Sequence, residues 1–206
     1  MIISNEMLSE IEAVVKEKLS EKRYLHTVAV CKAAALLTKL CLDDYENEVM
    51  AAALLHDITK EYNSREQVAL INEYGIDVDE DAKKSPAVLH SFTAEAFVKR
   101  NYPEFATPRV LSAIRNHTLG APDMSVFDQI IFLADYIEET RRIEACVKTR
   151  EFTFANMQEG DISNNQRVLI KACIMAIDYT ILHLIDEKKH INTQNVLTRN
   201  VLLSKI

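Results

Sequence analysis

The chain has 206 residues, of which 48% are hydrophobic and 27% are charged, and its formal net charge is −7. This length favours a single domain with room for a helical appendix, and the composition is that of an ordinary globular protein. The negative charge argues against a nucleic-acid polymer as the main partner, although it is compatible with a local basic pocket for a small nucleotide. Only three glycines and four prolines are present, so long helices are expected rather than many short strands.

The sequence indicates a cytoplasmic protein without a membrane partner. Its first residues, MIISNEMLSE, lack the basic start and apolar run of a signal peptide, and no apolar stretch approaches the roughly 20 residues that span a bilayer. The four cysteines show no CxxC spacing. Cys31 and Cys41 share a predicted helix, where they would lie about 15 Å apart, too far for a disulfide. Reduced thiols are therefore expected.

Helical periodicity and capping residues divide the chain into a series of predicted helices. Their ranges are 4–20, 22–42, 45–58, 64–74, 86–101, 107–118, 126–142, 161–189 and 193–204. Ser4 and Ser125 are candidate N-caps, and Asp43 or Asp44 is a candidate cap for the helix that follows them. Gly75 is expected to end its helix in a left-handed conformation.

Two segments, 77–85 and 143–160, give no clear helical pattern, and the sequence contains no repeat and no convincing strand. We therefore expect an all-α fold that forms one domain over residues 1–206. The apolar face of the segment 161–189 either completes the core or forms a dimer interface, and the sequence leaves both open.

Histidine and aspartate side chains recur on the apolar faces of these helices. Residues three, four or seven apart share a helical face, which places five polar residues where the core should be: His26, His56, His90, His117 and Asp135. A sixth, Asp57, directly follows His56 at the end of the apolar run 49–55. His183 and His190 have polar neighbours and are interpreted as solvated or structural residues.

A metal centre is the interpretation that explains these positions together. One histidine on an apolar face is usually a hydrogen-bonded core residue. A buried carboxylate, however, needs a cation or strong donors, and a metal would both compensate the carboxylates and bind the imidazoles. Nitrogen and oxygen ligands without a thiolate suit iron, manganese, zinc or nickel.

Four sequence blocks resemble a known family: RYLHT at 23–27, HDITK at 56–60, RNHT at 115–118 and ADYIE at 134–138. They are similar to the HD-domain metal-dependent phosphohydrolases, and within these to the YqeK-type bacterial proteins, which hydrolyse diadenosine tetraphosphate symmetrically to two ADP. The resemblance covers roughly residues 20–145. Leu119 and Gln129 depart from it, because a second threonine and a basic residue are frequent at these positions.

The resemblance implies an HD-domain helical bundle with additional C-terminal helices, a metal-site core at about 20–145 and a C-terminal helical part at about 150–206. It also implies a homodimer and a site with two metal ions, usually described with iron. His26, His56, Asp57 and Asp135 would bind the first metal, and His90 and His117 the second, with Asp57 bridging the two.

Asp57 and Lys60 are the predicted catalytic residues, and Lys60, one helical turn beyond His56, is placed to neutralise phosphate charge. Alternatively, Lys60 is an exposed lysine favoured by the helix dipole. The other candidate substrate contacts are Arg23, Thr27, Thr59, Arg115, Thr118 and Arg141. The three threonines either donate to phosphate oxygens or orient metal ligands. Glu138, one turn after Asp135, either orients a ligand or pairs with an arginine.

Three other functions remain open from the sequence. The protein could be an HD-type phosphohydrolase for a nucleoside monophosphate, a deoxynucleoside triphosphate or a signalling nucleotide. It could instead be a non-catalytic nucleotide-binding regulatory module, or a helical scaffold with buried polar clusters. Metal content and product analysis distinguish these alternatives.

Overall fold

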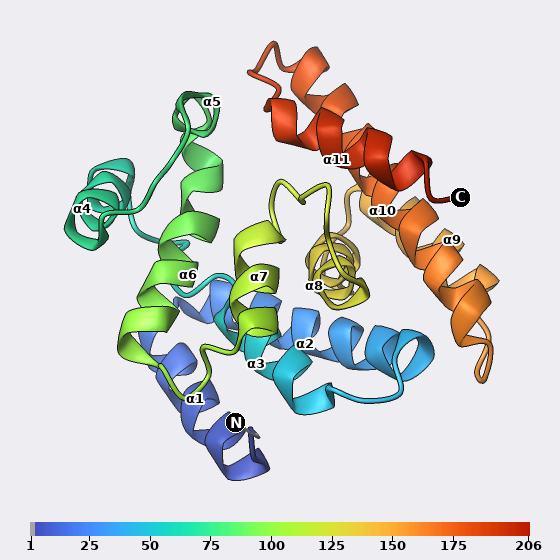
Figure 1. Cartoon of the computed structure of the whole chain (residues 1–206), viewed down its shortest axis with the longest axis horizontal. Helices are drawn as coiled ribbons and strands as arrows, with labels where there is room; N and C mark the ends of the chain where they lie inside the picture. The colour runs from blue at the N-terminus through green and yellow to red at the C-terminus, as the bar shows by residue number, and fades with distance from the viewer. Residues whose placement is uncertain (1–2) are drawn as a thin grey trace.

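The structure is a computed structural model that describes residues 3–206. Residues 1 and 2 lie outside this range. They belong to the expected domain of residues 1–206 and to the N-terminal segment MIISNEMLSE. The described chain is helical and contains no strand, which confirms the expected all-α class (Figure 1). The helices are α1 (Asn5–Lys18), α2 (Glu21–Cys41), α3 (Glu46–Leu55), α4 (Ser64–Tyr74), α5 (Glu80–Lys83), the 3₁₀ turn η1 (Pro86–Val88), α6 (Leu89–Asn101), α7 (Pro108–Asn116), α8 (Val126–Ile137), α9 (Glu144–Asn156), α10 (Ile162–Asp186) and α11 (Thr193–Leu203).

One hydrophobic core joins the N-terminal and C-terminal helices. Helix α2 packs against α3 and α8, and α8 also packs against α7 and α10. Figure 1 shows α8 end-on, between α7 and the pair α10 and α11. Fully buried side chains from these helices belong to one cluster, including Val30, Leu55, Ile114, Ile131 and Leu169. The long apolar helix predicted at 161–189 therefore contributes to the core.

All four cysteines lie buried in the protein as free thiols. This agrees with the expected absence of a disulfide.

Several predicted caps are present. The Ser4 side chain accepts a hydrogen bond from the backbone N–H of Met7, and Ser125 forms a capping box with Asp128 at the start of α8. Gly75 ends α4 with a φ of +62°, a left-handed conformation that favours glycine. These local signals are read correctly from the sequence because each depends on neighbouring residues only.

The predicted cap before α3 is wrong. The N-cap is Tyr45, with a φ of +78° and no side-chain capping bond. The Asp44 carboxylate instead accepts from the backbone N–H of Tyr45 at 2.7 Å. The left-handed turn at Tyr45 thus keeps both aspartates away from the free N–H groups of α3.

Helix ends and short elements account for the other differences. The helix predicted over 45–58 ends at Leu55, and that over 126–142 ends at Ile137. The helix predicted from residue 86 begins with a 3₁₀ turn, and 77–85 contains the short helix α5. The segment 143–160 holds α9, which the sequence pattern missed.

By length and composition alone, two described helices, α2 and α10, are long and apolar enough to cross a membrane. This differs from the sequence-based expectation that no stretch approaches such a length. Both helices pack against several others in the fold. Core helices of globular proteins pass the same test, so it does not by itself indicate a membrane protein.

Candidate metal centre

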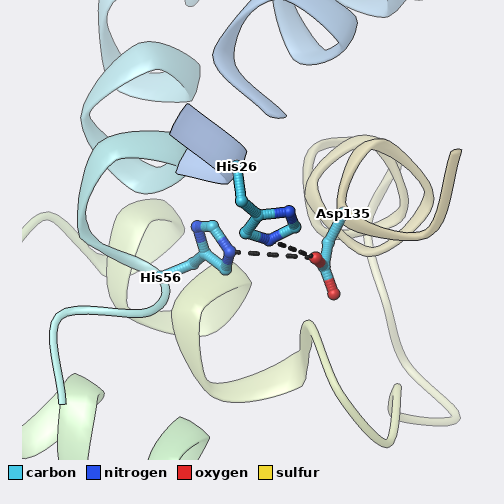
Figure 2. A group of neighbouring side chains, drawn as sticks. All are labelled: His26, His56 and Asp135. Atoms are coloured by element: carbon cyan, nitrogen blue, oxygen red, sulfur yellow. Dashed lines mark ion pairs between the residues drawn. The ribbon is translucent and has the colours of Figure 1, made fainter. Parts of the chain in front are cut away.

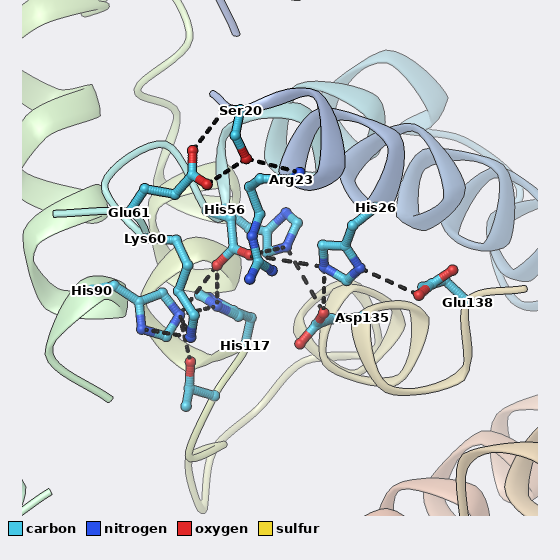
Figure 3. Close-up of polar contacts among 12 residues, drawn as sticks. Ser20, Arg23, His26, His56, Lys60, Glu61, His90, His117, Asp135 and Glu138 are labelled. Carbon is cyan, nitrogen blue, oxygen red and sulfur yellow. Dashed lines mark hydrogen bonds and ion pairs between the residues drawn. The ribbon is translucent and has the colours of Figure 1, made fainter. Parts of the chain in front are cut away.

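The predicted ligands meet where several helices begin or end. Figure 3 labels five of them, and Asp57 lies among the four histidines. His26 lies in the second turn of α2, and Asp135 lies near the end of α8. His56 and His117 are the C-cap residues of α3 and α7. Asp57 follows His56 in a turn, and His90 is the second residue of α6. Because α3 and α7 end here, the carbonyl oxygens of their last turns are free to accept from side chains.

Three of the histidines use such carbonyls in the same way. In each, Nδ1 contacts the backbone oxygen three residues earlier: His56 to Ala53 at 2.7 Å, His90 to Ala87 at 2.8 Å and His117 to Ile114 at 2.7 Å. A carbonyl only accepts, so Nδ1 carries the proton and Nε2 presents a lone pair. This tautomer suits metal binding through Nε2.

His26, His56 and Asp135 form one side of the centre (Figure 2). Asp135 Oδ1 lies 3.0 Å from His26 Nε2 and 3.9 Å from His56 Nε2. Both Nε2 atoms are buried without a hydrogen-bond partner. Buried polar atoms are rarely left unpaired, so a cation among these three side chains fits the donor set.

Asp57 joins this side to a second pair of histidines. Its Oδ2 lies 3.5 Å from His56 Nε2 and 3.8 Å from His26 Nε2. Its Oδ1 lies 3.2 Å from His90 Nε2 and 3.6 Å from His117 Nε2. The two latter Nε2 atoms are only 2.9 Å apart. Since both Nδ1 atoms face carbonyls, two lone pairs meet there, and a cation beside them, either a metal ion or the Lys60 ammonium 3.2 Å from His90 Nε2, relieves their repulsion.

The ionisation states of these groups suit metal binding, because the imidazoles of His56 and His90 are neutral and the two carboxylates are ionised. Burial lowers the pKa of His56 and of His90 to about 4, so both rings are neutral near pH 7. Burial opposes ionisation of Asp57, but the surrounding histidines, His56 first, hold its pKa well below the usual range. Burial likewise opposes ionisation of Asp135, but Arg141 and His26 hold its pKa well below the usual range.

Four of the predicted substrate contacts lie at this centre. Arg23 Nη1 is 2.8 Å from Asp57 Oδ2. Arg141 donates to the backbone oxygen and to Oδ1 of Asp135, both at 2.8 Å. Lys60 Nζ lies 3.2 Å from both ring nitrogens of His90, and Thr118 Oγ1 lies 3.3 Å from its Nε2. The positive charges of Arg23, Lys60 and Arg141 therefore surround the two carboxylates.

The other three predicted contacts have different surroundings. Thr59 is fully buried, and its hydroxyl contacts the backbone oxygen of His90 at 3.2 Å. Thr27 is also fully buried, without a hydrogen-bond partner for its hydroxyl. The guanidinium of Arg115 lies 3.3 Å from the ring centre of Phe92. This arrangement favours an orienting role for Thr59 and a packing role for Arg115.

A cavity of about 370 Å³ opens beside His26. Its lining residues are Ser20, Lys22, Arg23, His26, Glu61, Glu138, Thr140 and Arg141. Sequence reasoning missed Ser20, Lys22, Glu61 and Thr140. Glu61 directly follows the HDITK block, which is the one local signal for it, and its carboxylate accepts from the backbone N–H and hydroxyl of Ser20 at the start of α2.

A helical bundle that gathers four histidines and two aspartates in this way forms a candidate histidine–aspartate metal centre. The family described as "HD domain" matches residues 23–140. The chain belongs to the HD-domain family, which implies binding of divalent metal, and the clustered side chains fit such an ion.

Two relatives and one solved structure are similar over nearly the whole chain. A protein of Halalkalibacterium halodurans named "Bis(5'-nucleosyl)-tetraphosphatase, symmetrical" is 32% identical over 92% of this chain and 94% of its own length. A Bacillus subtilis protein of the same name is 29% identical over 95% and 97%, respectively. A Clostridium acetobutylicum structure, described as a predicted HD superfamily hydrolase involved in NAD metabolism, has a TM-score of 0.82, 26% identity and coverage of 96% and 97%.

Proposed function

We propose that the protein is a metal-dependent phosphohydrolase that cleaves diadenosine tetraphosphate symmetrically to two ADP. The observation that carries this proposal is the set of four histidines and two aspartates, with basic side chains around it. The names of the two similar bacterial proteins support the choice of substrate.

We assign two metal positions. His26, His56, Asp57 and Asp135 would hold the first metal, and His90 and His117 would hold the second, with Asp57 contributing to both. The contacts of the two Asp57 oxygens with different histidine pairs support this division. Iron is the proposed metal, and manganese, zinc and nickel suit the same ligands.

The chain's basic residues bind and orient the tetraphosphate. Such metals, when bound, activate water and neutralise charge on phosphoryl oxygens. Arg23 and Arg141 are placed to pair with phosphates that enter beside His26, because both line that cavity. Lys60 and Thr118, near His90, are placed to contact the phosphate that leaves. Addition of one water across the central P–O–P bridge then yields two ADP.

A nucleotide panel tests this proposal. The purified protein should contain transition metal, and chromatography should show ADP as the only product from diadenosine tetraphosphate. Nucleoside monophosphates, deoxynucleoside triphosphates and signalling nucleotides should react much more slowly. Release of ATP plus AMP would indicate an asymmetric hydrolase, and binding without turnover in the presence of metal would indicate a regulatory module.

We also propose that the protein acts in the cytoplasm as a homodimer. Large apolar side chains on the outer faces of α10 and α11 support a dimer, among them Leu182, Ile185 and Leu203, which are exposed in the single chain. Light scattering after size-exclusion chromatography should give twice the 23.4 kDa chain mass.

A further inference from the structure

His26 differs from the other three histidines of the centre in what its Nδ1 contacts. His56 and His117 are helix C-caps, and His90 follows a 3₁₀ turn, so each finds an unoccupied backbone carbonyl. His26 lies inside α2, where the carbonyls are used by the helix itself. Its Nδ1 instead lies 3.3 Å from Oε1 of Glu138.

The Glu138 side chain is buried and is held in place beside His26. Glu138 is the C-cap residue of α8, and only 1% of its surface is exposed. Thr140 donates its backbone N–H to one carboxylate oxygen and its hydroxyl to the other. These two bonds fix the carboxyl group in one orientation, with Oε1 directed at His26 (Figure 3).

The backbone around Glu138 is fixed from a third direction. Arg150, on α9, donates to the carbonyl oxygen of Glu138 at 3.0 Å and to that of Arg141 at 2.8 Å. The turn after α8 is therefore held at both ends by one guanidinium. A carboxylate acceptor on a rigid turn is a stronger partner for an imidazole N–H than a backbone carbonyl.

We propose that Glu138 is a positioning residue that holds His26 in the Nδ1–H tautomer, with Nε2 directed at Asp57 and Asp135. This inference rests on the metal centre of the proposed function and assigns a partner to one ligand. Without Glu138, the His26 ring is free to place its proton on Nε2, where Asp135 Oδ1 lies 3.0 Å away. A proton there would occupy the lone pair that the first metal needs.

The test compares three variants of the full-length protein. Glu138→Met keeps the side-chain volume but removes the acceptor, Glu138→Gln keeps an acceptor oxygen without the charge, and Glu139→Met changes the exposed neighbour, which pairs with Lys32 at the surface. Long-range ¹H–¹⁵N correlation spectra of the metal-free proteins report the His26 tautomer. Titration with Mn²⁺ measures affinity and stoichiometry without any substrate.

We expect Glu138→Met to lose the Nδ1–H tautomer of His26 and to bind one Mn²⁺ about tenfold to a hundredfold more weakly. Glu138→Gln should keep the tautomer and recover most of this affinity, and Glu139→Met should behave as the wild type. Glu138→Ala, in which water can reach the donors of Thr140, replaces the methionine variant if that protein does not fold.

If Glu138→Met keeps both the Nδ1–H tautomer of His26 and the wild-type Mn²⁺ affinity, the positioning role of Glu138 is overturned. The metal centre itself would stand. An equal loss in Glu139→Met would also overturn the positioning role, because the effect would then not depend on the contact with His26. Absence of Mn²⁺ binding in the wild type would instead overturn the metal centre and, with it, this inference.

Discussion

At the scale of single residues, Asp57 has the most contacts in the centre, since its two oxygens face histidines from α2, α3, α6 and α7. We expect Asp57→Asn to lower kcat/KM by more than about a hundredfold, because loss of an outer partner of a metal ligand alone costs up to that much. Bound metal should fall in parallel. The exposed Asp43→Asn is the matched control, and near-normal activity of Asp57→Asn would contradict the assignment.

Lys60 allows the chemical step to be separated from metal binding. Its ammonium lies beside His90 but is not a ligand, and burial lowers its pKa. We expect Lys60→Met to reduce kcat roughly tenfold to a hundredfold, the value of one charge-assisted contact, with metal content unchanged. A variant with normal kcat and full metal content would show that Lys60 has no part in catalysis.

Most of the candidate ligands could be picked out from the sequence because they lie on apolar helical faces, where a polar side chain is unusual, whereas Asp57 lies in the turn after α3 and was found by its position next to His56. Their pairwise partners could not be picked out, since the contact of His26 with Glu138 joins residues 112 positions apart. Likewise, the packing of Arg115 on Phe92 depends on how α7 meets α6, which periodicity within one helix does not report.

At the scale of elements, α9 supports the turn that follows α8. Arg150 supplies this support through its two bonds to carbonyl oxygens of that turn. We expect Arg150→Met to lower the free energy of unfolding by about 2 kcal/mol, and Tm by roughly 4–8 °C. Thermal unfolding of Lys148→Met, which removes only an exposed pair with Glu144, is the control. Equal Tm values for both variants would show that the Arg150 contacts do not stabilise the turn after α8.

Sequence patterns located most helices but extended several of them past their ends, α3 and α8 among them. Residues 56–58 and 138–142 have helix-compatible composition, so periodicity continues through them. What ends the helices is tertiary: after α3 the chain turns to place Asp57 between histidines, and after α8 the turn is fixed by Arg150. Helix α9 was missed, and its N-cap, Ile143, makes no side-chain capping bond that could have marked its start.

At the scale of the whole molecule, the buried histidines make the stability of the metal-free protein depend on pH. The pKa values of His56 and His90 are about 4 in the fold, against about 6.5 when unfolded. The unfolded chain therefore binds more protons between these values, and stability falls as the pH drops. At pH 5 the loss is about 2 kcal/mol for each histidine relative to pH 7.5.

Urea unfolding of the chelator-treated protein at pH 7.5 and pH 5 measures this loss. His26 acts in the opposite direction and offsets part of this loss: burial lowers its pKa, but Asp135 and Asp57 outweigh burial and raise the pKa, so its stabilising contribution is present at pH 5 and declines as the pH rises. His90→Asn should flatten the dependence, whereas the exposed His183→Gln should retain it. Equal stability at both pH values would show that the two rings are not buried as neutral groups.

Mass spectrometry of the products formed in H₂¹⁸O tests whether this centre hydrolyses its substrate symmetrically. With diadenosine tetraphosphate and the metal-loaded protein, we predict ADP as the only nucleotide product. Half of the ADP molecules should carry one ¹⁸O on the terminal phosphate, because one water adds at one inner phosphorus. Formation of ATP and AMP, or ADP without the label, would contradict the account.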